Sequence, residues 1–253
     1  MVYLKTPEEI RKMRKAGRVV ALAHEAIEAL IRPGISTKSI DELAEKIIRA
    51  EGAEPSFLHY GTPPFPASVC TSVNEAVVHG IPSSEYILQE GDIVSVDIGA
   101  KLDGFHGDMA RTFGVGKVDE NVQKLIKVTE ECFWKGFSKA LVGNRIGDIS
   151  LSVSEHAEAH GYGVVRELVG HGIGRNLHEE PDVPNFGKGA RGMRLVPGLV
   201  IAVEPMINMG NREIETKSDR WTIVTKDRKP SAHYENTIAI TEDGPLILTK
   251  VDL

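Results

Sequence analysis

Two aspartates interrupt apolar stretches of the sequence that have the pattern of neighbouring β-strands. Asp97 follows Val94 and Val96, and Asp108 lies in the next apolar stretch along the chain. The segment 101–104 (KLDG) predicts a turn, so both carboxylates would point to one face of an antiparallel hairpin. From the hairpin alone, one aspartate could still be an ordinary turn or edge residue. Because a carboxylate is rarely buried without a balancing charge, the pair predicts a cation site.

Two glutamates and a histidine in the second half of the chain have the same character. Glu204 ends the apolar run GLVIAVE, and Glu235 lies in a second predicted hairpin, residues 219–240, with a turn around Asp227. The alternation in SAHYENT predicts that Glu235 shares a face with the residues two positions away on either side. His171 stands between glycines in VGHGIG, which leaves room for close approach of a ligand.

These four carboxylates and one imidazole can converge only around positive charge, because each desolvated charge costs several kcal/mol. Two divalent cations would supply four positive charges against four negative ones. Oxygen-rich ligands suit manganese, iron(II), cobalt or magnesium better than a metal that prefers thiolates. Two such ions about 3.5–4 Å apart, bridged by shared carboxylates, are a known arrangement for hydrolysis. The ligand types therefore favour metal-assisted hydrolysis.

The elements that must position these residues come in two similar sets. In the first set, a helix is predicted to begin at Pro7, with Thr6 and Glu9 forming a capping box, and to end at Pro33-Gly34. A second helix is predicted from about residue 39 to residue 51, since its apolar residues recur on one face and a glycine follows.

The second half repeats this order of elements. A long helix is predicted to begin at Asp119, and a shorter one ends at Gly161. The strand GDIVSVD recurs as GLVIAVE 107 positions later, and VHGIP resembles GHGIG. The pairs separated by 109 positions are Gly34 and Gly143, Ile40 and Ile149, Ala50 and Ala159, and Gly52 and Gly161. Chance similarity is the alternative, but the pattern favours a duplicated α+β half in which both halves build one site. Since no Gly/Ser/Pro linker separates them, residues 1–253 are expected to form a single catalytic domain.

Composition narrows the class of protein further. The 253 residues are 41% hydrophobic and 26% charged, with a net charge of −6, which does not favour a nucleic-acid substrate. A local basic cluster in residues 11–18 is typical of a solvated helix face, with docking to an anionic partner such as ribosomal RNA as the alternative. The two cysteines are too few for a disulfide framework. No signal-peptide core and no run of 18 apolar residues is present, so a cytoplasmic protein without a membrane segment is expected.

The motifs taken together resemble a known family. VVHGIP, VDIGAKLDGFHGDMART, GHGIGRNLHEEP, AVEPMI and HYENTIAI contain His79, Asp97, Asp108, His171, His178, Glu204 and Glu235. Each motif is weak alone, but the set is similar to methionine aminopeptidase, type I, over nearly the whole chain. The resemblance implies the α+β pita-bread fold of the creatinase/aminopeptidase class, with two pseudo-symmetric halves, antiparallel sheet and helices packed outside. It also implies removal of the initiator methionine from nascent polypeptides.

The same resemblance implies a role for each ligand. Asp97 would bind one ion, His171 and Glu204 the other, and Asp108 and Glu235 would bridge them. The cofactors implied are two divalent metal ions per chain, such as cobalt, manganese, iron(II) or zinc. A hydroxide that bridges the ions would be the nucleophile, and Glu204 would also move a proton.

The resemblance further implies the residues that hold the substrate. His178 would donate a hydrogen bond to the scissile carbonyl and the oxyanion, and His79 would contact the amide on the far side of the bond. Phe65, Cys70 and Trp221 would line an apolar pocket for the methionine side chain. Taken alone, each of these five residues could equally be a satisfied histidine or part of the core.

Two segments depart from the family pattern. Tyr60-Gly61-Thr62-Pro63-Pro64-Phe65-Pro66 stands where an aromatic-glycine-aromatic-proline run is usual, and Leu177 precedes His178 where an aromatic residue is common. Tyr60 could fill the usual aromatic position or be displaced from it, so the shape of the pocket stays open.

Five other histidines have no assigned function. His24, His156 and His160 fall in predicted helices and are expected at the surface. His106 and His233 flank the predicted metal hairpins and could be supporting groups or simply exposed.

Two other functions compete with a methionine aminopeptidase. The first is a Xaa-Pro aminopeptidase or prolidase-like hydrolase on the same fold; such enzymes usually carry an extra N-terminal domain, whereas here the fold is expected to begin near Thr6. The second is a binding module that has lost its metal, which the complete ligand set disfavours. The expected partners are nascent polypeptide N-termini with a small second residue, met at the ribosome or free, and a monomer is the default oligomeric state.

Overall fold

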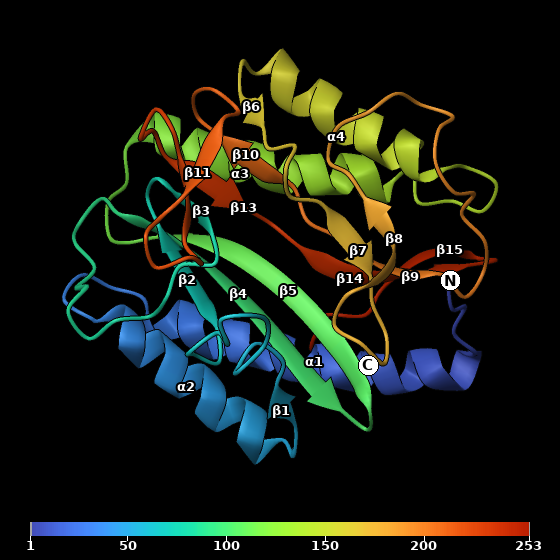
Figure 1. Cartoon of the computed structure of the whole chain (residues 1–253), viewed down its shortest axis with the longest axis horizontal. Coiled ribbons are helices and arrows are strands. Elements are labelled where there is room, and N and C mark those ends of the chain that lie inside the picture. The colour runs from blue at the N-terminus through green and yellow to red at the C-terminus, as the bar shows by residue number, and fades with distance from the viewer. Residues whose placement is uncertain (1, 253) are drawn as a thin grey trace.

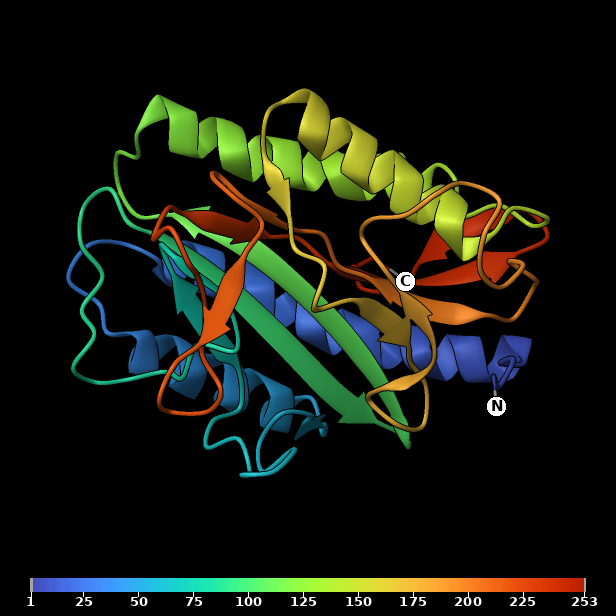
Figure 2. The same cartoon turned by 45° about the horizontal axis from the view of Figure 1, so that its top comes forward.

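The computed structural model describes residues 2–252, which form four helices and a set of mainly short strands. In Figures 1 and 2 two helices lie on each side of the molecule and the strands lie between them. The helices are α1 (Pro7–Leu30), α2 (Thr37–Ala50), α3 (Glu120–Phe137) and α4 (Ile146–Ala159). The predicted capping box is present at the start of α1, where Thr6 and Glu9 satisfy each other's backbone N–H groups. No helix within residues 2–252 is both long enough and apolar enough to cross a membrane.

The described strands pair into four sheets. They are β1 (Glu54–Pro55), β2 (Cys70–Val73), β3 (Ala76–Val78), β4 (Ile93–Leu102), β5 (Phe105–Gly114), β6 (Gly163–Val164), β7 (Gly170–Gly172), β8 (Glu179–Val183), β9 (Val200–Val203), β10 (Met206–Asn208), β11 (Ile214–Thr216), β12 (Ile223–Thr225), β13 (Ser231–His233), β14 (Asn236–Thr241) and β15 (Gly244–Ile247). One sheet has the order β1-β4-β2, with β5 also paired to β4, and another has the order β15-β14-β9-β7-β8. The two smaller sheets are β13-β10-β6 and β11-β12-β3. Each pairing between these strands is antiparallel.

The structure confirms the internal repeat. Helix α4 begins and ends 109 positions after α2, and β6 likewise follows β1 by 109 positions. The pairing repeats as well, because Glu54 faces Lys101 in the first half and Gly163 faces Asn208 in the second. The similarity of VHGIP to GHGIG is not part of this repeat: His79 follows β3 in a small sheet, whereas His171 lies within β7 of the five-stranded sheet.

Successive side chains of β4 point to opposite faces of the sheet, so its apolar residues and its carboxylate lie on different faces. Val94, Val96 and Ile98 join the core formed with α1 and α2. Asp97 therefore points away from these helices, toward the second half of the molecule. Helices α3 and α4 cover the corresponding outer face of the second half, where they pack on β6, β10 and β13.

Strand β5 joins the two halves through a symmetric pair of threonines. The Thr237 hydroxyl accepts from the Asp108 N–H (3.0 Å) and donates to the Asp108 carbonyl (2.9 Å). The Thr112 hydroxyl makes the same two bonds, both 2.9 Å, with the backbone of His233. In the repeat Thr112 corresponds to Thr237, since they face Ser95 and Ala202 at matching positions of β4 and β9.

The predicted hairpin over residues 219–240 is wrong. There is a turn around Asp227, but β12 pairs with β3 and β11, whereas β13 pairs with β10 in another sheet. The sequence between these strands has a normal hairpin pattern, and only the long-range partners separate them. The apolar run that contains Glu235 is also two strands, because pairing is interrupted at Tyr234 and Glu235.

The prediction that His24 lies at the surface is also wrong. His24 is on the face of α1 that packs on the first sheet, and its Nε2 donates to the Met109 carbonyl at 2.9 Å. Helix α1 crosses β5 closely because glycines meet there. A Cβ atom on Gly107 would lie 2.7 Å from the Gly17 nitrogen, and one on Gly17 would lie 2.3 Å from the Leu248 oxygen.

We expect Gly107→Ala to lower the free energy of unfolding by about 1–3 kcal/mol, because the added methyl group would meet backbone atoms of α1 that cannot rotate away. Chemical denaturation measures this change. Gly189→Ala is the control, since its methyl group would meet only the ends of the Asp148 and Leu151 side chains at 3.2 Å. Equal stability of the two variants would contradict the close packing of α1 on β5.

Candidate metal and peptide site

The first hairpin places its two aspartates on one face, as the sequence predicts. Asp97 faces Ala110 and Asp108 faces Gly99, so the two carboxylates are diagonal neighbours across β4 and β5. The turn itself is Asp103-Gly104, and both of its residues have positive φ angles, 52° and 82°. This is the geometry of a two-residue hairpin turn, and it fixes the register that brings the carboxylates together.

The second pair of carboxylates lies on matching strands of the other half. Met206 faces His233 on one side of an interruption and Val203 faces Asn236 on the other, with unchanged register. Glu204 therefore lies opposite Glu235, at the point where both strands leave regular pairing. In the repeat, Glu204 occupies the position of Asp97.

His171 turns one nitrogen toward this group. Its Nδ1 donates to the Gly172 carbonyl at 2.8 Å, so the Nε2 lone pair of the neutral ring is free to bind a cation. Nε2 lies 3.6 Å from Glu204 Oε1 and 4.0 Å from Asp108 Oδ2. Burial, together with nearby His178, lowers the pKa of His171 to about 3, which keeps the ring neutral.

Burial shifts every carboxyl group of the cluster toward its neutral form. It raises the pKa of Asp97 to about 7, and it raises the pKa values of the other three carboxyl groups well above their usual range. Mutual repulsion adds to the shift: Asp97 and Glu204 act on Asp108, and Asp108 and Glu204 act on Glu235. Four acids in this position can ionise together only when cations bind among them.

The unpaired atoms of the cluster fit such cations. Asp97 Oδ1, Asp108 Oδ1 and Glu235 Oε1 are buried and have no hydrogen-bond partner among the described residues. Ligand atoms of Asp108, His171 and Glu235 lie within 4.8 Å of one another. Carboxylate oxygens with one imidazole are a donor set that divalent metals bind, so the residues present fit a metal centre.

His233, for which sequence reasoning gave no function, belongs to the same cluster. Its Nε2 lies 3.8 Å from Glu204 Oε2 and 3.8 Å from Glu235 Oε2, and neither ring nitrogen has a hydrogen-bond partner. Burial lowers its pKa to about 3, so the ring is neutral. In the repeat His233 occupies the position of Asp108, because they face Met206 and Gly99. Extending the repeat from β4 to the following strand would have identified it. His106 is also buried, but its Nδ1 pairs with the Ser56 hydroxyl at 2.8 Å.

A cavity of about 150 Å³ opens over the cluster. In an apolar interior, a cavity of about this size holds a molecule as large as benzene. All ten residues predicted for the site line it, and so do Phe57, Tyr60 and Leu177. The predicted residues are Phe65, Cys70, His79, Asp97, Asp108, His171, His178, Glu204, Trp221 and Glu235.

The apolar part of the lining is held by aromatic contacts. Trp221 packs edge-on against Phe65, with ring centroids 5.2 Å apart. A Cβ atom on Gly61 would lie 2.6 Å from Trp221 Cη2, so the indole packs directly on this glycine. Cys70 faces Asp97 across β2 and β4, and burial raises the pKa of its thiol well above the usual range, which argues against a nucleophilic cysteine.

The two cavity histidines are placed differently. His178 lies beside His171, with ring centroids 4.2 Å apart, and its Nδ1 is 2.6 Å from the Tyr60 hydroxyl. His79 has a positive φ of 58° immediately after β3, and burial lowers its pKa to about 4. Tyr60 is thus not displaced from the site, although the sequence around it is unusual.

Comparison with known proteins agrees with this geometry. The pattern of metallopeptidase family M24 matches residues 11–242. A methionine aminopeptidase of Clostridium acetobutylicum is 52% identical over 98% of this chain and 99% of its own length. Methionine aminopeptidase 1 of Bacillus subtilis is 51% identical over 99% of this chain and all of its own length.

Solved structures give the same result for the fold. The methionine aminopeptidase of Thermotoga maritima has a TM-score of 0.96 at 43% identity and covers 99% of this chain and 100% of its own. A prolidase of Pyrococcus furiosus has a TM-score of 0.79 at 24% identity, with 66% of its chain covered, and this likeness shows the fold alone. The pita-bread fold is confirmed, and the methionine aminopeptidase relatives are favoured over the prolidase alternative.

The predicted family is therefore confirmed: the chain belongs to the methionine aminopeptidases of metallopeptidase family M24, which are metal-dependent exopeptidases.

Proposed function

We propose that the protein removes methionine from the N-termini of nascent polypeptides, with two divalent cations held by Asp97, Asp108, His171, Glu204 and Glu235. One observation supports this most strongly: four carboxyl groups, two of them fully buried, and a neutral imidazole lie beneath a small, largely apolar cavity. Divalent cations bound there would polarise the scissile carbonyl and make a water molecule more acidic. Manganese, cobalt, iron(II) and zinc all suit these ligands.

We assign the oxyanion contact to His178. Burial lowers its pKa, so the ring is neutral at neutral pH and carries one proton. The Tyr60 hydroxyl, whose own pKa is raised by burial, can donate to Nδ1. This bond would leave the ring proton on Nε2, where it can be donated to the carbonyl oxygen as negative charge develops. Tyr60 is then a positioning residue that selects the tautomer of His178.

The remaining assignments concern the ends of the substrate. Phe65, Cys70 and Trp221 offer polarisable, apolar contacts to a methionine side chain. His79 would contact the amide beyond the scissile bond. The cavity wall that His79 forms there would leave little room for a large second residue of the peptide. Glu204, at the interruption of its strand, would carry the proton from water to the leaving amine.

The peptide Met-Ala-Ser should release free methionine when the protein is supplied with Mn²⁺ or Co²⁺, whereas Met-Lys-Ser should not. The lysine side chain would have to fit against His79 and its neighbours. Amino-acid analysis of the released methionine is the measurement. Dialysis against a chelator should abolish the release, and added metal should restore it. Equal turnover of both peptides would contradict the proposed wall beyond the scissile bond.

Tyr60→Phe should lower kcat/KM by about tenfold or more with little change in KM, because the ring still fills the cavity wall but no longer orients the His178 proton. Steady-state kinetics on Met-Ala-Ser would measure both constants. Tyr86→Phe is the matched control, since Tyr86 is exposed and does not line the cavity. An unchanged kcat in Tyr60→Phe would rule out its positioning role.

His233→Leu should weaken Mn²⁺ binding by about tenfold or more, because it removes both ring nitrogens from beside Glu204 and Glu235 while keeping an apolar bulk. Titration calorimetry measures the affinity directly. His106→Leu removes a buried histidine outside the cavity and serves as the control. The same Mn²⁺ affinity in both variants would show that His233 does not support the metal centre.

A further inference from the structure

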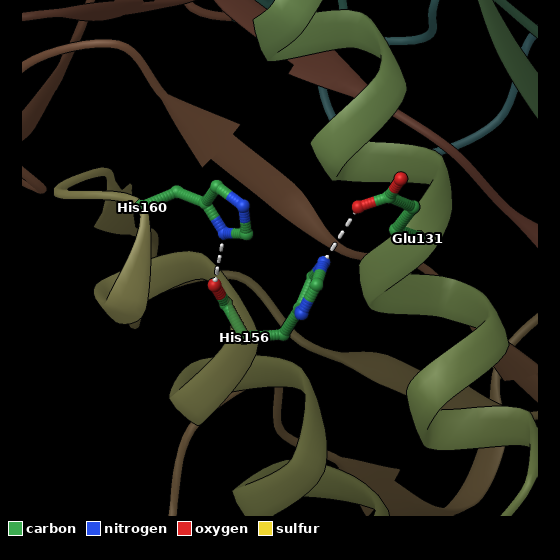
Figure 3. Close-up of side chains that lie close together, drawn as sticks. All are labelled: Glu131, His156 and His160. Carbon is green, nitrogen blue, oxygen red and sulfur yellow. Dashed lines mark hydrogen bonds and ion pairs between the residues drawn. The ribbon is translucent and has the colours of Figure 1, made fainter.

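A second group of metal-binding side chains lies on the outer helices. Glu131 projects from α3, His156 from α4, and His160 stands at the C-terminal end of α4 (Figure 3). One ligand atom from each lies within 4.8 Å of the other two. None of the three lines the catalytic cavity.

The hydrogen bonds within this group already orient its ligand atoms. His156 Nε2 lies 2.8 Å from Glu131 Oε2, which links α4 to α3. His160 Nδ1 lies 2.9 Å from the His156 carbonyl, and because a carbonyl only accepts, Nδ1 carries the ring proton. The lone pair of the neutral His160 ring is therefore on Nε2, and Figure 3 shows this nitrogen on the side that faces Glu131.

The geometry of α4 allows His156 and His160 to bind the same metal ion. Residues four apart on a helix lie on one face, and the His156 and His160 rings are 4.8 Å apart. The side chains remain accessible from solvent, with 37% of the Glu131 side chain and 18% of the His156 side chain exposed. The Lys127 ammonium group lies 3.9 Å from Glu131 Oε1, which is not the oxygen bonded to His156.

We propose that Glu131, His156 and His160 bind one transition-metal ion, such as Zn²⁺, which links α3 to α4 at a site separate from the catalytic centre. Two imidazoles and one carboxylate are a ligand set that zinc accepts, with water in the fourth position. The same set is poor for Mg²⁺ or Ca²⁺, which prefer oxygen ligands. An ordinary helix-to-helix hydrogen bond needs only His156 and Glu131, so the contribution of His160 distinguishes a metal site from such a contact.

The test counts Zn²⁺ bound per chain by equilibrium dialysis of the full-length protein. The chain should bind one equivalent more than His160→Ala or Glu131→Gln, because loss of one of three ligands should weaken this site about tenfold or more. Glu155→Gln is the matched control for charge, because Glu155 is exposed on α4 and is not one of the three proposed metal-binding residues. It should bind as much Zn²⁺ as the unchanged chain.

The same variants separate this site from the catalytic one. Circular dichroism and release of methionine from Met-Ala-Ser with Mn²⁺ should be unchanged in His160→Ala, since none of the substituted residues contacts the cavity. Equal Zn²⁺ stoichiometry in the unchanged chain and His160→Ala would overturn the proposal. A loss in Glu131→Gln with none in His160→Ala would also overturn it, because it would reveal a charge effect and not a three-ligand site. Neither result depends on the peptide specificity of the protein.

Discussion

The interaction on which the rest of the structure depends is the mutual repulsion of four carboxyl groups, two fully buried and two partly exposed to the cavity, where the two halves meet. Isolated in an apolar interior, these groups take up protons, as the raised pKa values of all four show. As ligands, they would supply negative charge to divalent cations in a desolvated site, which would offset the repulsion between them. Paired strands hold these groups close in spite of the repulsion, with α1 and α2 packed behind β4 and α3 and α4 packed behind β9.

The repeat explains how such a cluster can be built from ordinary elements. Asp97 and Glu204 occupy equivalent positions, and so do Asp108 and His233. Each half contributes a strand whose outer face packs on that half's own pair of helices, and the inner faces of the two halves meet. The hydroxyl groups of Thr112 and Thr237 then link the halves by hydrogen bonds to the backbone of His233 and Asp108.

The sequence was sufficient to predict the helices and the first hairpin, because these depend on local spacing. Helix caps mark where the helices begin, and the alternation of apolar and polar residues identifies the strands of the first hairpin. The residues that line the cavity came from the resemblance to a known family. The sequence was not sufficient where the structure of a segment depends on contacts with residues far away in the chain. The strand after Trp221 has a hairpin pattern but pairs with β3, and His24 looks like a surface residue until β5 packs on it. The bond from Tyr60 to His178 spans 118 residues and has no local signal.

The two-fold relation between the halves bears on how such a chain could arise. A polypeptide of half this length, paired with a second copy of itself, would bring the same kinds of side chain around one axis, but every position would have to be identical on both sides. Joining the copies into one chain removes that restriction. Ala110 can then face Asp97 in one half while Glu235 lies opposite Glu204 in the other, so the two halves place different side chains around one cavity.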